Sequence, residues 1–243
     1  MAAIFLPGIT VPAHIAYAPL LGELAGSTTT FTKELEVYRD ERPPDGYRLD
    51  LEIEGLERFA VDQGVEQFHL YGHSLGGAIA LAYAAEHGDR VLSLALNEPA
   101  TDFSEQDRAA IADEGLDDVP GPERMQHFVR QLLRPGVEVP PPPSGPPGPE
   151  MAKRPAGVAA ATAALDAFDV DLERLRRYRG PVLYSYGALS NARWEAMAER
   201  FPTLFPRCAV LRYEDRHHLD APHQAEPTRM AATLRELWAA PAP

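Results

Sequence analysis

The chain has 243 residues, 45% of them apolar and 8% aromatic, so it is long enough for one large α/β domain with a sizeable core. Its formal net charge of −13 argues against nucleic acid or an anionic membrane as a partner, because both require a basic patch. Cys208 is the only cysteine, which excludes an internal disulfide, and the first apolar run is broken at once by Pro7-Gly8. We therefore expect a cytoplasmic protein without a signal peptide or a membrane span.

Short apolar runs alternate with longer helical patterns, which is typical of a mostly parallel sheet covered by helices. Strands are predicted near residues 2–6, 33–39, 67–72, 91–97, 181–186 and 207–213. Helices are predicted over residues 12–26, 49–63, 75–87, 192–200 and 224–239. The last helix places Leu234, Leu237 and Trp238 on one face.

Residues 101–178 interrupt this alternation. Helical patterns there cover 104–114, 122–133 and 150–168. A proline-rich stretch at 135–149 is incompatible with a helix or a central strand and favours extended polyproline-II segments. We therefore predict an α/β core formed by 1–100 and 179–243, with 101–178 as a helical insert.

The most informative segment is Gly72-His73-Ser74-Leu75-Gly76-Gly77. An apolar run precedes it and a helical stretch of small residues follows it, so Ser74 is expected at the apex of a sharp strand–turn–helix. The helix N-terminus behind the serine offers free N–H groups to a developing anion. Here the chain resembles the α/β-hydrolase superfamily, whose nucleophile elbow has this pattern.

The resemblance carries implications for the fold. It implies that 101–178 form a cap over the active site. The family's sheet usually has two strands before the one that we place at 2–6, so we expect about six strands here. The strand at 33–39 should then lie nearer an edge than usual, where pairing with a second copy would protect it. Both a monomer and a homodimer are compatible with the sequence.

A serine nucleophile needs a base, and in this superfamily the base is a histidine after the last strand. Glu214-Asp215-Arg216-His217-His218-Leu219-Asp220-Ala221-Pro222 follows that strand. The usual family pattern is Gly-His-apolar with a proline a few residues later. His218 fits this register, and His217 is the alternative.

The acid of the triad is missing from its usual place. Most relatives carry it as Gly-x-x-Asp after the strand at 181–186, where this chain has Gly187-Ala188-Leu189-Ser190-Asn191. Several haloalkane dehalogenases, which use an aspartate nucleophile, carry the acid at the end of the preceding strand. The matching position here is Glu98, and a buried carboxylate there is costly without a partner. Glu98 is our candidate; Glu195, Asp215 and a Ser–His dyad remain alternatives.

The resemblance also implies an oxyanion hole of two backbone N–H groups. One belongs to Leu75, directly after the nucleophile, and the other to the loop after the first strand. Because Pro7 has no N–H, Ile9 is the expected second donor. Candidate substrate-lining residues are His14 at the mouth and Phe103, Met125, Phe128 and Leu132 in the insert.

These features predict a serine hydrolase that cleaves an ester, thioester or lactone bond of a small or medium, partly apolar molecule. No metal or organic cofactor is expected. The fold also hosts other chemistry, so two alternatives stay open. One is a lyase or cyclase that uses the same residues for proton transfer, and the other is a ligand-binding protein without turnover.

Overall fold

The computed structural model describes residues 1–101, 121–139 and 148–240. In this part of the chain a parallel sheet of six strands has the order β2-β1-β3-β4-β5-β6. The strands are β1 (Ala2–Leu6), β2 (Thr29–Thr32), β3 (Phe68–His73), β4 (Val91–Asn97), β5 (Val182–Gly187) and β6 (Cys208–Tyr213). Five of them coincide closely with the predicted strands.

The prediction of a strand at 33–39 is wrong. The edge strand is β2 at Thr29–Thr32, and Glu36–Tyr38 form a short 3₁₀ helix, η1. The carboxylate of Glu52 accepts the backbone N–H groups of Glu36 and Val37 at 2.8 and 3.0 Å. These N–H groups are therefore bound to a side chain rather than to a neighbouring strand. The expectation that this strand lies at an edge of the sheet is confirmed for β2.

The helices follow the predicted positions closely. They are α1 (Ala13–Leu24), α2 (Leu49–Asp62), α3 (Leu75–Glu86), α5 (Gly121–Gln131), α6 (Pro149–Ala152), α7 (Arg154–Asp166), α8 (Leu172–Leu175), α9 (Ala192–Leu204), α10 (Pro222–Ala225) and α11 (Pro227–Ala239). Short 3₁₀ helices are η2 (Gly88–Arg90) and η4 (His218–Asp220). The last long helix begins at Pro227, a residue favoured in a first helical turn, rather than at 224. Among the described residues, no helix is long and apolar enough to cross a bilayer.

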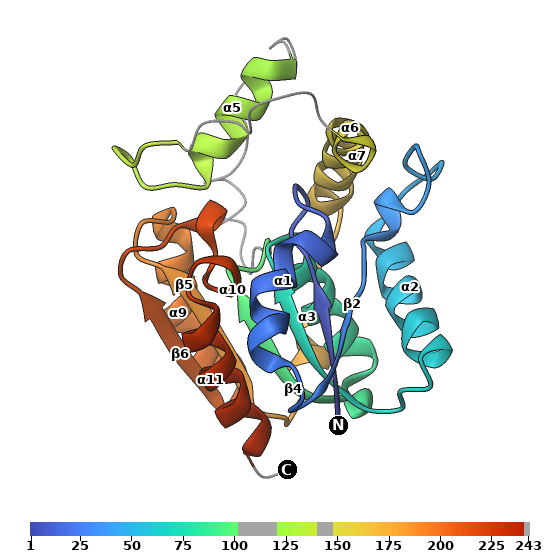
Figure 1. The fold of residues 1–243 in the computed structure, drawn as a ribbon, viewed down its shortest axis with the longest axis vertical. Coiled ribbons are helices and arrows are strands. Elements are labelled where there is room, and N and C mark those ends of the chain that lie inside the picture. Colours follow the sequence, from blue (N-terminus) through green and yellow to red (C-terminus); the bar gives the residue numbers. More distant parts are fainter. Residues whose placement is uncertain (102–120, 140–147, 241–243) are drawn as a thin grey trace.

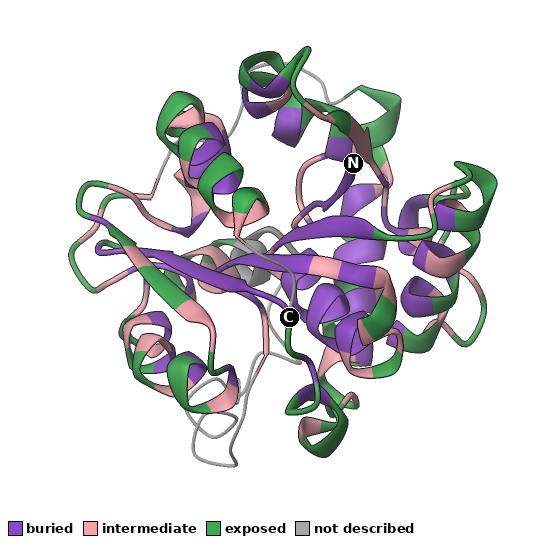
Figure 2. Cartoon of the chain, turned by 90° about the horizontal axis from the view of Figure 1, so that it is seen from below, coloured by how far each residue is buried: buried purple, intermediate pink, exposed green. Residues whose placement is uncertain are grey.

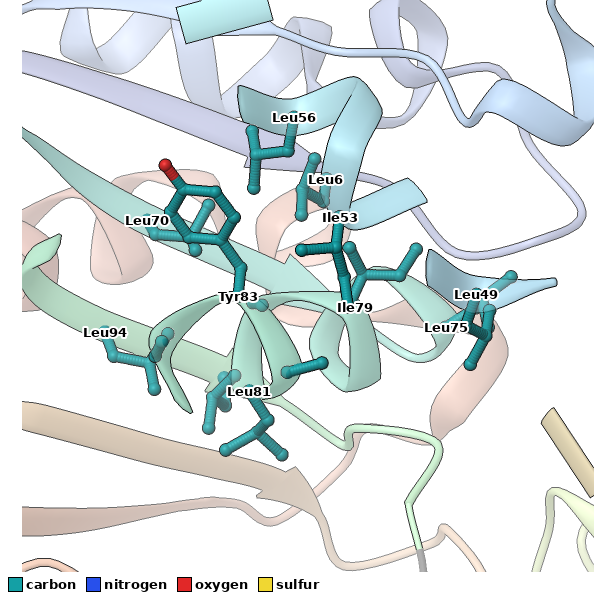
Figure 3. Close-up of a cluster of buried hydrophobic side chains, with 14 of the residues drawn as sticks. Leu6, Leu49, Ile53, Leu56, Leu70, Leu75, Ile79, Leu81, Tyr83 and Leu94 are labelled. Atoms are coloured by element: carbon teal, nitrogen blue, oxygen red, sulfur yellow. The ribbon is translucent and has the colours of Figure 1, made fainter. Parts of the chain in front are cut away.

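Helices cover both faces of the sheet, and each face has its own apolar core. On one face, residues of α2 and α3 pack on β1, β3 and β4, and α9 packs on β5 and β6; Figure 3 shows Ile53 of α2 close to Ile79 of α3. On the other face α1 and α11 pack side by side. The inner strands β1, β3, β4 and β5 are accordingly buried between two layers, whereas the edge strands β2 and β6 are partly exposed, as Figure 2 shows in purple, pink and green. Burial on both faces explains why the sequences of the inner strands are apolar runs rather than alternating patterns.

The helices α5–α8 lie in the chain between β4 and β5, where the insert was predicted. In Figure 1, β1 starts at the N-terminus at the bottom, so the carboxyl ends of the parallel strands point toward the top. Helices α5, α6 and α7 lie at this upper end. The start of α7 is attached to the core, because the Arg154 guanidinium stacks 3.8 Å from the Tyr38 ring centroid and pairs with Glu34 at 2.7 Å. The predicted pattern at 104–114 lies outside the described residues.

Glycines allow β3 and α3 to approach each other at the turn that joins them. A Cβ at Gly72 would lie 2.3 Å from the Gly76 carbonyl oxygen, and one at Gly76 would lie 2.4 Å from the Leu6 carbonyl oxygen. Both neighbours are backbone atoms, which have little freedom to move. The turn therefore requires glycine at both positions for space.

We predict that Gly72→Ala lowers the free energy of unfolding by about 1–3 kcal/mol, because the added methyl group overpacks a rigid turn. Urea unfolding measures the change. The matched control is Gly22→Ala in α1, where an added Cβ would meet no atom within 4 Å. That variant should be stabilised by about 0.5–1 kcal/mol, as expected for alanine in a helix. Equal stabilities of Gly72→Ala and the native protein would show that the turn has room for a side chain.

Candidate active site

Ser74 lies at the apex of the turn between β3 and α3 and has a left-handed backbone conformation, with φ of 53°. This conformation costs about 1–3 kcal/mol for a residue other than glycine. Hydrogen bonds hold it: the Ser74 N–H donates to the Asn97 carbonyl at 3.1 Å, and its own carbonyl accepts the Ala100 N–H at 2.9 Å. The end of β4 therefore fixes the orientation of the serine.

His218 opens the short helix η4 in the loop after β6 and is 4% exposed. Its Nε2 lies 3.0 Å from the Ser74 hydroxyl oxygen. Its ring stacks on the Trp194 indole, with centroids 4.3 Å apart and planes inclined by 11°. The indole N–H in turn donates to the Pro99 carbonyl at 3.3 Å. Packing thus restricts the imidazole to the plane in which it meets the serine.

Glu98 directly follows β4, is 1% exposed and also has a positive φ, of 45°. Its Oε2 lies 2.7 Å from Nδ1 of His218. Its Oε1 accepts the Gly187 backbone N–H at 2.6 Å and the Ser190 hydroxyl at 2.5 Å. An ionised carboxylate can only accept hydrogen bonds, so Nδ1 of His218 carries the proton that it donates to Glu98. In the neutral imidazole, Nε2 is then free to accept the hydrogen bond from the Ser74 hydroxyl. The three side chains form one continuous chain of hydrogen bonds.

The alternative residues from the sequence have other contacts. His217 caps η4 by accepting the backbone N–H groups of Leu219 and Asp220. Glu195 forms an ion pair with Arg134, and Asp215 is exposed. Of these candidates, His218 and Glu98 are the ones that the fold brings to Ser74.

The loop after β1 packs against the serine turn. A Cβ at Gly8 would lie 3.0 Å from Nδ1 of His73 and 3.4 Å from the Ser74 Cβ. The Gly76 N–H donates to the Pro7 carbonyl at 3.1 Å, and the Tyr38 hydroxyl donates to the Ile9 carbonyl at 2.7 Å. Among the described residues, no hydrogen bond is formed by the N–H of Ile9 or of Leu75, the first residue of α3. Both predicted oxyanion donors are therefore available to a ligand.

A cavity of about 50 Å³ adjoins Ser74 and His218. The described residues that line it are Gly8, Ile9, Thr10, Val11, Ala16, His73, Ser74, Phe128, Leu132, His218, Leu219, His223 and Gln224. Phe128 and Leu132 were predicted to line it from the insert. His14 is not among the lining residues; it is largely exposed, with its Nε2 3.6 Å from Glu150. Phe103 and the side chain of Met125 lie outside the described residues.

Sequence reasoning missed the two further imidazoles, of His73 and His223, that pack beside the site. The His73 ring lies 4.8 Å from the His218 ring and 4.9 Å from the His223 ring, measured between centroids. Nδ1 of His223 lies 3.1 Å from the Tyr71 hydroxyl. The position of His223 in the loop after the last strand, near the carboxyl edge of the sheet, was the available signal.

Ligand atoms of His73, Glu98 and His218 lie within 4.8 Å of one another, a spacing that would also suit ligands of one metal ion. Two ligands of a tetrahedral zinc ion are about 3.3 Å apart, given metal–ligand distances near 2.0 Å. The 2.7 Å between Glu98 and His218 is shorter and matches a charge-assisted hydrogen bond. The geometry is that of a hydrogen-bonded carboxylate–imidazole pair rather than of a metal centre.

Burial shapes the charge states of these groups. It raises the pKa of Glu98 to about 7, although the donors Gly187 and Ser190 act in the opposite direction. It lowers the pKa of His218 well below the ordinary value, with a smaller contribution from the positive charge of Arg193. It likewise lowers the pKa values of His73 and His223. At neutral pH the three imidazoles are uncharged, as a general base requires.

We predict that stability falls as the pH drops below about 6.5, the pKa of histidine in an unfolded chain. Below this pH, His73 and His223 bind protons in the unfolded chain but stay neutral in the folded protein, because their folded pKa values are lower. Each contributes at most about 1.4 kcal/mol per pH unit, so the pair should remove at most about 2.5 kcal/mol between pH 6 and 5. The raised pKa of Glu98 has the opposite effect, because between pH about 7 and 4.5 the folded protein binds a proton that the unfolded chain does not. This gain in stability on acidification offsets the loss caused by the lowered pKa of His218.

Urea unfolding at pH 7, 6 and 5 measures this dependence. His223→Gln should reduce the slope by up to about 1.4 kcal/mol per pH unit. Gly22→Ala, which changes no titratable group, should leave the slope unchanged. A native protein that is equally stable at pH 5 and pH 7 would contradict the buried, neutral state of these imidazoles.

Comparisons with known proteins agree with this architecture. A thermophilic esterase from Thermogutta terrifontis has a TM-score of 0.72 at 19% identity, over 97% of this chain and 88% of that one. A haloalkane dehalogenase variant from Bradyrhizobium elkanii has a TM-score of 0.67 at 15% identity, over 98% and 88%. A structure from a study of carboxylesterases of Nitrososphaera gargenis has a TM-score of 0.69 at 18% identity, over 98% and 89%. At such low identity these likenesses show the fold alone.

A comparison with curated proteins finds no match. A family model described as the alpha/beta hydrolase fold matches residues 56–222, which include Ser74, Glu98 and His218. This match covers more than half of the chain, and the parallel sheet with the strand–turn–helix around Ser74 is what that fold requires. The chain therefore belongs to the α/β-hydrolase fold family.

Proposed function

We propose that the protein is a serine hydrolase that cleaves an ester, thioester or lactone bond of a small or medium, partly apolar substrate through an acyl-enzyme. One observation carries the proposal: the hydrogen-bonded chain from the Ser74 hydroxyl through His218 to Glu98, at 3.0 and 2.7 Å. The serine at its end adjoins a cavity and two free backbone N–H groups. This is the set of groups that acyl transfer needs.

The proposed reaction starts with attack of the Ser74 oxygen on the substrate carbonyl, while Nε2 of His218 takes the hydroxyl proton. The N–H groups of Ile9 and Leu75 stabilise the oxyanion of the tetrahedral intermediate. The imidazolium then gives its proton to the leaving group. A water molecule, deprotonated by His218, attacks the acyl-enzyme and releases the acid.

Glu98 has two roles in this scheme. Its Oε2 accepts the Nδ1–H of His218, which keeps the tautomer in which Nε2 can accept a proton. Its negative charge stabilises the imidazolium that forms during attack. Because the site is buried, this electrostatic contribution is screened little by water.

We predict that Ser74→Ala lowers kcat for short p-nitrophenyl esters by at least about a thousandfold, because the members of a triad act as a unit. The alanine removes only the hydroxyl, so the urea midpoint should stay near that of the native protein. A loss of less than about tenfold would exclude Ser74 as the nucleophile. A native protein without any esterase activity would favour the lyase, cyclase or binding alternatives.

The assignment of Glu98 as the acid of the triad is tested by neutralising each candidate carboxylate in turn and measuring kcat. Glu98→Gln should lower kcat by about a hundredfold or more, because an amide does not stabilise the imidazolium. Glu195→Gln and Asp215→Asn are matched controls at the two other carboxylates considered for the triad, and both should retain nearly full activity. Equal losses in the three variants would remove Glu98 from the proposed triad.

The cavity predicts a preference for short acyl groups. A volume of about 50 Å³ holds a few water-sized groups, so acetyl and propionyl esters should exceed octanoyl esters in kcat/KM by about tenfold or more. Leu132→Ala should widen the cavity and shift the preference toward longer chains. Leu133→Ala, the buried neighbour that does not line the cavity, should leave the preference unchanged. A native protein that prefers octanoyl esters would contradict this specificity.

A further inference from the structure

The carboxylate of Glu98 depends on two donors besides His218. Its Oε1 accepts the Gly187 N–H at 2.6 Å and the Ser190 hydroxyl at 2.5 Å. The Gly187 donor belongs to the backbone of β5, whereas the Ser190 donor is a side chain in the loop that follows. Ser190 is 0% exposed, so water does not replace its hydroxyl. The short distance and the acceptor-only carboxylate make the hydroxyl the donor.

The segment after α5 fixes the loop that carries Ser190. Leu133 and Ser190 form an antiparallel bridge. The Arg134 N–H donates to the Leu189 carbonyl at 3.0 Å, and the Asn191 N–H donates to the Leu132 carbonyl at 3.1 Å. Leu132 also lines the cavity beside Ser74. The same stretch of the insert therefore contacts the cavity and holds the loop that supports Glu98.

We propose that Ser190 is a positioning residue, which acts through Glu98 by fixing the orientation of its carboxylate and favouring its ionised form. This inference rests on the proposed function, since it concerns the acid of the same triad. A hydrogen bond from the hydroxyl is stronger to a charged carboxylate than to a neutral one, so it stabilises the anion that His218 needs. Removal of the Ser190 hydroxyl leaves the Gly187 N–H as the one remaining donor to Oε1 among the described residues.

The other groups around Glu98 do not substitute for this hydroxyl. His218 uses Oε2, and Arg193 on α9 and His217 before η4 act on the carboxylate from other elements without a hydrogen bond to Oε1. The hydroxyls of Tyr71 on β3 and Tyr184 on β5 interact with it as neutral groups, because burial holds their pKa values well above the ordinary value. Loss of the Ser190 hydroxyl is therefore expected to raise the pKa of Glu98 further.

The test is the pH dependence of kcat/KM for an acetyl ester in Ser190→Ala. At pH 6, below the pKa of Glu98 in both proteins, the ionised fraction is smaller still in the variant, which should lose about tenfold or more relative to the native protein. At pH 9, where Glu98 is ionised in both proteins, the loss should shrink to about threefold or less. The acid limb of the profile should move to higher pH. If Ser190→Ala does not fold, Ser190→Cys keeps the shape and offers only a weak donor.

The matched control is Ser93→Ala on β4. Ser93 is 1% exposed, and its hydroxyl bonds Nδ1 of His69 at 2.8 Å, so the change removes an equally buried hydroxyl that does not contact Glu98. This variant should keep the native pH profile. In a Glu98→Gln background, Ser190→Ala should cause no further pH-dependent loss, because its target is absent.

A Ser190→Ala protein with the native acid limb, whether its activity is lower at every pH or not, would overturn the inference. Failure of the proposed function has a different signature. It would appear in the native protein as a lack of turnover, or as full activity in Ser74→Ala.

Discussion

The hydrogen bond between Glu98 and His218 is the interaction on which the candidate site depends. Both groups are almost fully buried, and burial disfavours the charged form of each. A carboxylate in such a place is unfavourable unless donors surround it. The imidazole, Gly187 and Ser190 are those donors; Gly187 and Ser190 belong to the end of β5 and the loop after it, and His218 belongs to the loop after β6. Because burying the carboxylate is costly, its presence is more readily explained by a catalytic role than by a contribution to the stability of the fold.

The parallel sheet makes this convergence possible. All strands end at one edge, so residues 74, 98, 187 and 218, which follow or end β3, β4, β5 and β6, meet there although they are far apart in sequence. Two of them, Ser74 and Glu98, have positive φ values. The strained conformations are held by cross-strand hydrogen bonds, such as those from the Ser74 N–H to Asn97 and from the Glu98 N–H to Ser185. The fold thus stabilises the backbone that aims these side chains.

The sequence predicted those parts of the site that depend on local pattern. Ser74 follows from its flanking glycines, and His218 from its distance to Pro222 after the last strand. Glu98 followed from the absence of a carboxylate at 187–191 and from the cost of a charge after an apolar strand. Ser190 stands in that same loop, yet its role depends on a contact between residues 92 positions apart, which one sequence does not reveal.

The errors in the fold prediction have a similar origin. Val37 and Tyr38 are apolar and suit a strand, but the buried carboxylate of Glu52, 15 residues beyond Val37, binds the backbone there. Thr29–Thr32 form the edge strand with only partly buried side chains, so their apolar signal was weak. Tertiary contacts decided between two neighbouring segments with similar local preference.

The central claim is that Ser74 is an activated nucleophile, and covalent labelling tests it most directly. The intact mass of the native protein and of Ser74→Ala would be measured after exposure to a small fluorophosphonate. The proposed triad predicts one adduct on the native protein, and none on Ser74→Ala, because the hydroxyl that bonds Nε2 of His218 is gone. An unlabelled native protein, or an equally labelled Ser74→Ala, would contradict it.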